Sequence, residues 1–577
     1  MKTKFLVTIV VVLILTGCAE DFLNRPPQDA LVDASFYQTD DQLLAGTADL
    51  YSAVWKDYCD QANWKIGDVR AGVLYSPWAT SSDIRDFTTF NVTGLSAANV
   101  SAYRAFYQVI GQANTIIHNI NLYAGASVTA RIKNHTIAEA RFMRATAYTY
   151  LVLNYGPVPV IEDNTAYLNN PALRRNTVES VWEFIRRDYE FAAENLSETP
   201  IQTGRLTKWS AEGMLARTYL TLAGHSGTLN AQHLTKAKEH AERVITMSGK
   251  SLLPRYGNLF LWPYDNNNES LFELQWVFTS NNDLRYKHAN TMISQITPSN
   301  SIAANGDGWG GGVGATGWML KLYDGLYNPE SLLIDSDTAF WSASPGFTLD
   351  QRLRETFMLP GFKYPELAAK DDSFLSAGDK AVRFLPNGNN AAPGDGLHFA
   401  WIKKYVIGPV AGETAYQNYP NNVYMLRLAE MYLIYAEATV LQNGGTTSDG
   451  QALQYFNAVH TRAGLPPFTD PLTWDEIFKE RVKEFAMEGM AWYDLARRHY
   501  YDAQHVYDLI NSQERGQYLV SPEPWPNPTG WNLYDVLWDD ETDRVLAGPS
   551  NFLMPIPQVE LSQAPSLREE PVPYIFD

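Results

Sequence analysis

Apolar segments with helical periodicity, arranged in pairs, constrain the fold of this chain more than any other feature. Eight segments are expected to be helices: residues 101–122, 131–155, 177–196, 208–224, 231–248, 423–442, 450–463 and 474–500. Within three pairs, the starts lie 30, 31 and 27 residues apart. These spacings are close to the roughly 34-residue period of tetratricopeptide repeats. The sequence therefore predicts a mainly α fold of tetratricopeptide-like helix pairs.

Local signals mark the ends and faces of several of these helices. Thr177 is placed to cap the start of one helix, and Gly156 with Pro157 ends another. Small residues recur on the segment 131–155 and predict close helix packing: Ala138, Ala140, Ala145 and Ala147.

Two C-terminal segments differ in their polar residues. The segment 423–442 is apolar except for one narrow face, which predicts a helix buried nearly all round; that face holds Arg427, Glu430 and Glu437. The segment 474–500 is amphipathic. The charged residues off its apolar stripe are expected to face solvent: Glu480, Lys483, Glu484 and Glu488.

Glycine, proline and asparagine interrupt the pattern between residues 249 and 420. A loop-rich region of this length inside a helical protein is typically functional, so we expect the ligand-binding part here. The expected organisation is a single unit over residues 18–577. Its helical scaffold covers mainly 40–248 and 423–500, and its irregular C-terminal part covers 501–577.

The N-terminus has the features of an export signal. Two lysines precede an apolar run from Phe5 to Leu15, which is shorter than the roughly 20 residues that span a bilayer. Leu15-Thr16-Gly17-Cys18 matches a bacterial lipobox, so residues 1–17 are expected as a lipoprotein signal peptide and Cys18 as the lipidation site. Cys59, the second of two cysteines, is expected to be a buried inert thiol.

Charge and motifs exclude several classes of function. The formal net charge is −19, and removal of Lys2 and Lys4 with the signal peptide makes it −21, which disfavours nucleic acid as a partner. The chain has no His-Glu-x-x-His, Gly-x-Ser-x-Gly or P-loop motif, and its histidines do not recur at ligand spacing. We expect no catalytic residues, no cofactor and no metal.

Short motifs along the whole chain resemble one family. They are Leu15-Thr16-Gly17-Cys18, Gln112-Ala113-Asn114-Thr115, Ala138-Glu139-Ala140-Arg141, Asn154-Tyr155-Gly156-Pro157, Gly204-Arg205-Leu206-Thr207-Lys208, Leu426-Arg427-Leu428-Ala429-Glu430, Thr461-Arg462-Ala463-Gly464, Trp492-Tyr493-Asp494-Leu495 and Met554-Pro555-Ile556-Pro557. In this order they make the chain similar to the SusD/RagB family of outer-membrane nutrient-binding lipoproteins. Departures from the family pattern are Met487-Glu488-Gly489 and the ending Arg568-Glu569-Glu570-Pro571.

The resemblance implies a SusD-like fold, in which the tetratricopeptide-like helix pairs are wrapped by a loop-rich irregular second part. It also implies a non-catalytic lipoprotein, anchored in the outer membrane and facing the exterior. It would bind neutral oligosaccharide or polysaccharide and deliver it to a SusC-like TonB-dependent β-barrel transporter. Two alternatives remain open at this stage. The chain could be a peptide- or protein-binding member of the same family, or a secreted helical glycosidase.

Aromatic residues in loops are the expected ligand contacts, because aromatic rings stack on the apolar faces of sugars. We place the site where the loop around residues 64–86 meets the Gly-rich loop near 306–318. The expected stacking residues are Trp78 and Trp309, with Tyr75, Trp64 and Trp318 as secondary candidates. Asp83 and Arg285 are the expected contacts to sugar hydroxyls.

Overall fold

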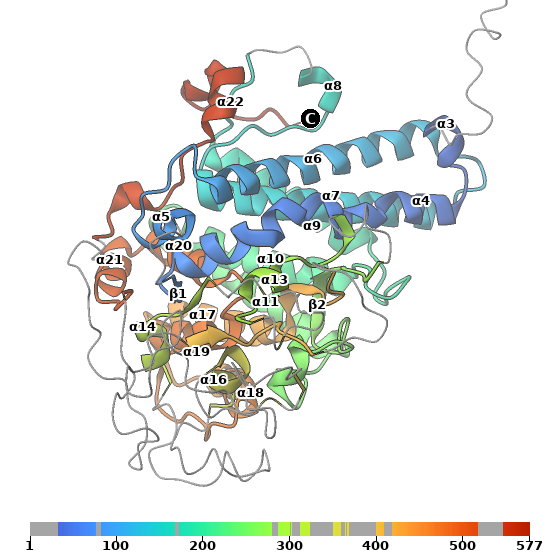
Figure 1. Ribbon diagram of the computed structural model, residues 1–577. Helices are drawn as coiled ribbons and strands as arrows, with labels where there is room; N and C mark the ends of the chain where they lie inside the picture. Colours follow the sequence, from blue (N-terminus) through green and yellow to red (C-terminus); the bar gives the residue numbers. More distant parts are fainter. Residues whose placement is uncertain are drawn as a thin grey trace, which may run out of the picture.

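The computed structural model describes residues 33–76, 82–167, 172–279, 287–299, 302, 308, 312–323, 350–358, 364, 366–367, 400–408, 418–516 and 546–576. The long helices α6, α7 and α9, together with the short helix α4, form the upper part in Figure 1, and α10, α11, α17 and α19 lie below them. This arrangement confirms the predicted mainly α fold. Within the described ranges, no helix is long and apolar enough to cross a membrane.

Most of the described chain is helical. The α-helices are α3 (Asp33–Phe36), α4 (Asp40–Thr47), α5 (Ser82–Thr88), α6 (Ala97–Tyr123), α7 (Ala130–Tyr155), α8 (Asn164–Tyr167), α9 (Val178–Asn195), α10 (Lys208–Gly224), α11 (Ala231–Met247), α13 (Met292–Ile296), α14 (Gly317–Lys321), α16 (Arg352–Thr356), α17 (Leu428–Gln442), α18 (Gly450–Arg462), α19 (Trp474–Phe485), α20 (Ala491–His499), α21 (Ala503–Asn511) and α22 (Gln558–Gln563). Short 3-10 and π-helical turns are η1 (Ala48–Tyr51), η2 (Ala53–Trp55), η3 (Tyr58–Ala62), η4 (Lys65–Val69), η5 (Tyr256–Phe260), η8 (Pro549–Asn551) and η9 (Pro565–Arg568).

The strands are short and form three small antiparallel sheets. They are β1 (Leu74–Tyr75), β2 (Ser270–Leu274), β3 (Gly314–Ala315), β4 (Phe357–Met358), β5 (Ala400–Ile402), β6 (Val423–Arg427), β7 (Thr446–Thr447) and β8 (Leu472–Thr473). One sheet has the order β1-β3-β5-β4, and the other two are the pairs β2-β6 and β7-β8. The four-stranded sheet joins segments that are far apart in the sequence.

Six predicted helices are confirmed, with ends within a few residues: α6, α7, α9, α10, α11 and α18. The hydroxyl of Thr177 accepts a hydrogen bond from the Ser180 N–H and caps α9, and Gly156 caps the end of α7. The four alanines of the segment 131–155 are fully buried in α7, which packs against α6 and α9. Close packing through small residues is therefore confirmed.

The segment 423–442 is not one helix, so that prediction was wrong at its start. Residues 423–427 form β6 and pair with β2, and α17 begins only at Leu428. A short, continuously apolar run can form either a buried strand or a buried helix, and periodicity does not distinguish them. Pairing with β2 decides between the two. As predicted, α17 itself is buried nearly all round.

The predicted helix 474–500 is broken into α19 and α20. Between the two helices, Met487 and Gly489 have φ values of +65° and +72°. A Cβ on Gly489 would lie 1.9 Å from the side-chain oxygen of Asn63, and a Cβ on Gly67 would lie 2.2 Å from the Gly489 carbonyl oxygen. The two backbones meet so closely that only glycine fits at both positions, and the chain must leave the helix there.

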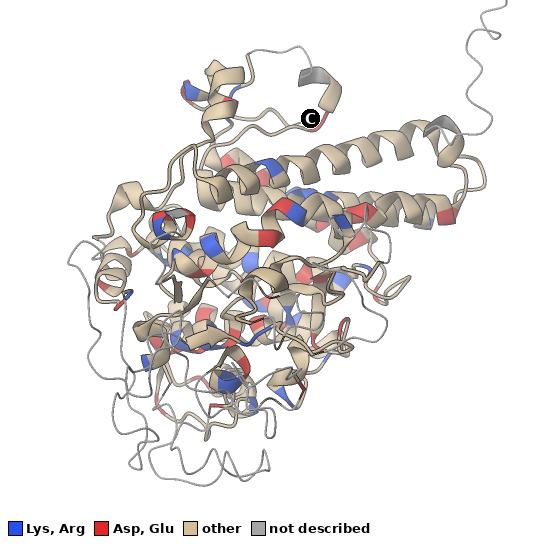
Figure 2. Ribbon diagram, in the orientation of Figure 1, with Lys and Arg blue, Asp and Glu red and all other residues tan. Residues whose placement is uncertain are grey.

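The charged residues expected on the solvent side of the segment 474–500 are buried, which corrects the prediction. Their exposed fractions lie between 0% and 7%. They belong to a group that we call the Arg427 cluster, which consists of Arg352, Lys404, Arg427, Arg462 and Lys483 with Glu269, Asp350, Glu480, Glu484 and Glu488. Figure 2 shows acidic and basic residues interleaved in this lower part, around α16, α17 and α19. Ion pairing stabilises charges that would otherwise be too costly to bury.

Candidate functional site

The two segments expected to form the ligand site meet in the four-stranded sheet. Tyr75 of β1 is opposite Gly314 of β3, and Leu74 is opposite Ala315. Next to this pair, the Thr316 hydroxyl donates a hydrogen bond to the Gly72 carbonyl oxygen at 2.7 Å and accepts one from the Met319 N–H at 3.0 Å. The same side chain thus ties β1 to the start of α14.

Trp318, one of the two tryptophans predicted in the Gly-rich segment, lies in α14 beside this sheet. Its side chain is half-buried against the core and is therefore partly accessible to a ligand. The Trp318 backbone N–H donates a hydrogen bond to the Glu514 carbonyl oxygen at 3.3 Å, which fixes α14 against the chain after α21. Stacking on a sugar requires an accessible ring that is held in place. Among the described candidates, Trp318 meets this requirement best.

Trp64 and Tyr75 do not meet that requirement. Each ring is only 3% exposed and belongs to the hydrophobic core. The Lys65 ammonium lies 5.3 Å from the centre of the Trp64 ring. Stacking needs a free ring face, so the structure gives these two rings a packing role and corrects their expected exposure.

Asp83 also has partners within the protein. One carboxylate oxygen accepts from the Lys65 ammonium at 2.5 Å, and the other accepts from the Ala98 N–H at 3.3 Å. These contacts hold the start of α5 against η4 and α6. Asp83 therefore positions α5 within the fold. Its predicted contact to a sugar hydroxyl would have to compete with these partners.

Four further predicted residues lie outside the described residues: Cys18, Trp78, Arg285 and Trp309. Ser76, the described residue nearest to Trp78, directly follows β1, and Gly308, the described residue nearest to Trp309, precedes β3 in the chain. Their predicted roles in lipidation and ligand binding stay predictions.

Sequence reasoning missed Trp401 in this sheet. It lies in β5 opposite Gly314 and is 9% exposed. The three-residue strand Ala400–Ile402 is too short to give a periodic signal, and its neighbour β3 is 86 positions away along the chain. Only the sheet pairing reveals that Trp401 lies beside β3, where its largely buried ring supports the sheet.

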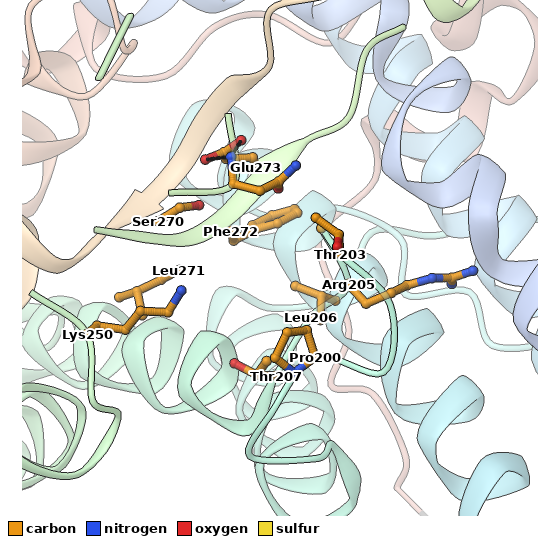
Figure 3. Close-up of a pocket in the computed structure, with 12 residues that line it drawn as sticks. Pro200, Thr203, Arg205, Leu206, Thr207, Lys250, Ser270, Leu271, Phe272 and Glu273 are labelled. Atoms are coloured by element: carbon orange, nitrogen blue, oxygen red, sulfur yellow. Dashed lines mark hydrogen bonds between the residues drawn. The ribbon is translucent and has the colours of Figure 1, made fainter. Parts of the chain in front are cut away.

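A pocket of about 240 Å³ lies in a different part of the fold, beside β2 (Figure 3). It is lined by Pro200, Thr203, Gly204, Arg205, Leu206, Thr207, Lys250, Asn266, Ser270, Leu271, Phe272 and Glu273. Figure 3 shows the Arg205 side chain directed away from the pocket, where it bonds to Glu139 and Thr47. This pocket could not be predicted from the sequence, because its lining comes from three separate segments.

Two further sets of reactive side chains, the thiol of Cys59 and the charges of the Arg427 cluster, lie in the interior of the fold. Cys59 is a buried free thiol, as predicted, and burial raises its pKa strongly, which disfavours the reactive thiolate. In the part of the chain that the structure describes, no group of three or more His, Cys, Asp or Glu side chains could hold a metal ion. The Arg427 cluster is buried and consists of paired charges, so its carboxylates are inaccessible to a substrate.

Comparison with known proteins identifies the family. Residues 268–572 match the SusD family, and residues 26–220 match a family described as starch-binding associating with outer membrane. A SusD-like protein of Bacteroides ovatus is 33% identical over 600 residues, covering 100% of this chain and 99% of its own length. The chain therefore belongs to the SusD family of glycan-binding proteins.

Solved structures agree with this assignment. A crystal structure determined with xylogluco-oligosaccharide has 31% sequence identity and a TM-score of 0.74, and covers 93% of this chain and 99% of that chain. A SusD superfamily protein from Parabacteroides distasonis has 21% identity and a TM-score of 0.64, and covers 91% of this chain and 98% of that chain. The latter likeness establishes the helical SusD fold alone.

Proposed function

We propose that this chain is a non-catalytic, lipid-anchored protein of the outer membrane that captures glycan and delivers it to a TonB-dependent transporter. The observation that carries the proposal is the pairing of β1 with β3, which joins the two aromatic segments named from the sequence. The site comprises Trp78, Trp309 and Trp318, with Arg285 as the contact to hydroxyls. Membership of the SusD family supports glycan as the class of ligand.

Xyloglucan oligosaccharide is the ligand that we propose to test first. The structure determined with xylogluco-oligosaccharide is 31% identical and aligns over 93% of this chain. Neutral, branched oligosaccharides present both apolar ring faces and hydroxyls, which matches tryptophan and arginine as contacts. Their lack of charge also suits a chain with a formal net charge of −19.

Affinity gels with xyloglucan, laminarin and starch, followed by calorimetric titration, test this function. Wild-type protein should be retarded by xyloglucan and release no reducing sugar from it. In Trp309→Ala and Trp318→Ala, affinity should fall by roughly thirtyfold, the effect of losing a hot spot worth about 2 kcal/mol. The matched control is Met247→Ala, an exposed apolar residue at the end of α11. Unchanged affinity in both tryptophan variants would remove the proposed site.

Anchoring and partner binding are tested separately. Palmitate should label the wild type but not Cys18→Ala. Gentle detergent extraction should recover a large β-barrel protein together with the chain. Equal labelling of both proteins would refute lipidation, and recovery of the lipoprotein alone at several detergent strengths would contradict the transporter complex.

The peptide-binding alternative is tested with the same protein. The peptide-binding alternative is rejected when a peptide library neither binds to the protein nor displaces bound glycan. Binding of peptides with loss in Trp318→Ala would instead favour it over the glycan proposal.

A further inference from the structure

The pocket beside β2 is separate from the proposed glycan site. In Figure 1, β1 and α14 lie at the left edge of the molecule, whereas β2 lies to the right of its centre. The pocket is formed by the connection between α9 and α10, by Lys250 after α11, and by β2 with Asn266 just before it. None of these segments contributes to the four-stranded sheet.

The lining of this pocket combines a fixed acceptor with a free donor. Glu273 is only 2% exposed, and its carboxylate accepts hydrogen bonds from the Asn266 N–H at 3.0 Å and from the Asn422 side chain at 2.8 Å. The half-buried Lys250 ammonium has no hydrogen-bond or ion-pair partner among the described residues. Burial lowers its pKa. Figure 3 shows its side chain at the edge of the pocket.

Hydroxyl and apolar groups complete the lining. Thr203 supplies an exposed hydroxyl, while Leu206, Leu271 and Phe272 supply apolar surface. The Thr207 and Ser270 hydroxyls also line the pocket, but they are bonded to Ser210 and Glu273. This mixture can hydrogen-bond to sugar hydroxyls and also contact the apolar face of a sugar ring. At about 240 Å³, the pocket is smaller than the roughly 300–1,000 Å³ typical of drug-sized ligands, so it suits one ring better than a longer segment.

Two exposed aromatic residues lie in the loop that precedes Asn266, a residue that lines the pocket. Trp262 is 42% exposed and Tyr264 is 43% exposed. The Cα atom of Tyr264 can lie at most roughly 7 Å from that of Asn266, and the Cα atom of Trp262 roughly 14 Å, because the chain between them is so short. The Asn267 side chain donates a hydrogen bond to the Tyr264 carbonyl oxygen at 3.0 Å and helps to hold the loop.

We propose that this pocket and the rings of Trp262 and Tyr264 form a second saccharide-binding site. The pocket holds one sugar unit, and the rings stack on neighbouring units of the same polysaccharide. The inference rests on the proposed function in that glycan is the ligand of the protein. Two sites on one chain bind a long polymer more tightly than either site alone, because the second contact becomes intramolecular.

The test compares long and short ligands in the full-length chain. The probes are xyloglucan polysaccharide on affinity gels and its oligosaccharides in calorimetric titration. In the double variant Trp262→Ala with Tyr264→Ala, and in Lys250→Met, affinity for the polysaccharide should fall by about tenfold. Oligosaccharide affinity at the first site should stay unchanged. Leu229→Ala, an exposed apolar residue between α10 and α11, is the control for surface truncation.

A second measurement separates this site from the first. In the background Trp309→Ala with Trp318→Ala, methyl glycosides of glucose, xylose and galactose are examined by saturation-transfer NMR. Residual transfer that disappears with Lys250→Met supports the second site even where xyloglucan is not the ligand. Absence of residual transfer, together with unchanged polysaccharide affinity in the second-site variants, overturns it.

A protein-docking role for the two rings is the opposing outcome. It would appear as reduced recovery of the barrel partner with Trp262→Ala and Tyr264→Ala, while polysaccharide binding stays unchanged. That result would overturn the saccharide proposal. Melting curves provide the folding control, because these exposed rings are not part of the hydrophobic core.

Discussion

The upper and lower parts of the helical scaffold bury their polar groups in different ways. In the upper part, α7 packs through alanines, and its buried charges form small groups of ion pairs, which include Arg144 with Asp188 at 2.8 Å and Arg205 with Glu139 at 3.1 Å. In the lower part, the Arg427 cluster joins many charges. A second chain of ion pairs runs beside it, through Arg217, Glu430, Arg481, Asp494, Arg497 and Glu437.

This difference shows which side chains determine the helix packing in each part. Small side chains let helices approach, but they accept several similar packings. A buried charge, by contrast, is tolerable only next to its partner, so each ion pair penalises an altered register. Although burial alone would raise it, Arg462 and Arg427 lower the pKa of Glu484 to about 2, so this carboxylate stays ionised at the centre of the lower part.

Removal of Arg427 should have the largest effect on stability. Arg427→Met leaves Glu269, Glu484 and Glu488 without their shared guanidinium, whose nitrogens lie 2.6 to 2.9 Å from their oxygens. We expect a loss of about 3–5 kcal/mol in the free energy of unfolding, measured by urea denaturation. A loss below about 1 kcal/mol would mean that the cluster does not specify the lower part.

Asp68 is a buried carboxyl group beside the break between α19 and α20. Its titration should show how much stability is lost when a buried group becomes charged. Burial raises the pKa of Asp68 to about 8, even though the Gly489 N–H donates to its carboxylate at 2.9 Å. Because the folded state holds this proton more tightly than the unfolded state, stability falls as pH rises between about 4 and 8. Asp68→Asn should remove that fall, gaining about 1.4 kcal/mol per pH unit relative to wild type.

Urea denaturation at several pH values measures the Asp68 effect. The control is Asp41→Asn, an exposed acid in α4, whose difference from wild type should not change in this way. A difference for Asp68→Asn that stays flat from pH 5 to pH 7 would contradict the raised pKa.

Enlarging a small residue probes the upper part. Ala145 is fully buried in α7, so Ala145→Leu should overpack the helix interface and lower stability by about 1–3 kcal/mol. Ala130→Leu, at the exposed first position of the same helix, should change stability far less. Equal melting temperatures for the two variants would show that α7 has room for larger side chains.

Surface ion pairs should contribute least. Arg186 bonds to Glu183 and Glu190 on α9, and the three side chains are 29% to 38% exposed. Arg186→Met should change the free energy of unfolding by at most about 1 kcal/mol. A loss as large as that of Arg427→Met would show that burial is not what distinguishes the two kinds of ion pair.

The sequence predicted regular helices well and the buried charges poorly. Periodicity and end signals located α6, α7, α9, α10, α11 and α18, because these depend on neighbouring residues. The break at Gly489 and the strand β6 depend on partners far away in the chain, Asn63 and β2. Glu484 looks like a surface residue until Arg427 and Arg462 are placed next to it.

The predicted meeting of the two candidate segments is confirmed by the pairing of β1 with β3. Their role in ligand binding stays a prediction. Which rings are exposed could not be read from the sequence, since Trp64 and Tyr75 are buried by residues from other elements. The pocket beside β2 has no sequence signature at all, because its three segments meet only after folding.

The contact between Gly67 and Gly489 has a consequence for the order of folding. The Gly489 N–H donates a hydrogen bond to Asp68 across 421 positions of sequence. During synthesis, η4 cannot reach its final environment until nearly all of the chain has emerged. Contacts with such sequence separation form slowly and leave partly folded chains open to aggregation. The turn η4 can therefore form its native contacts only after the segment between α19 and α20 has been synthesised.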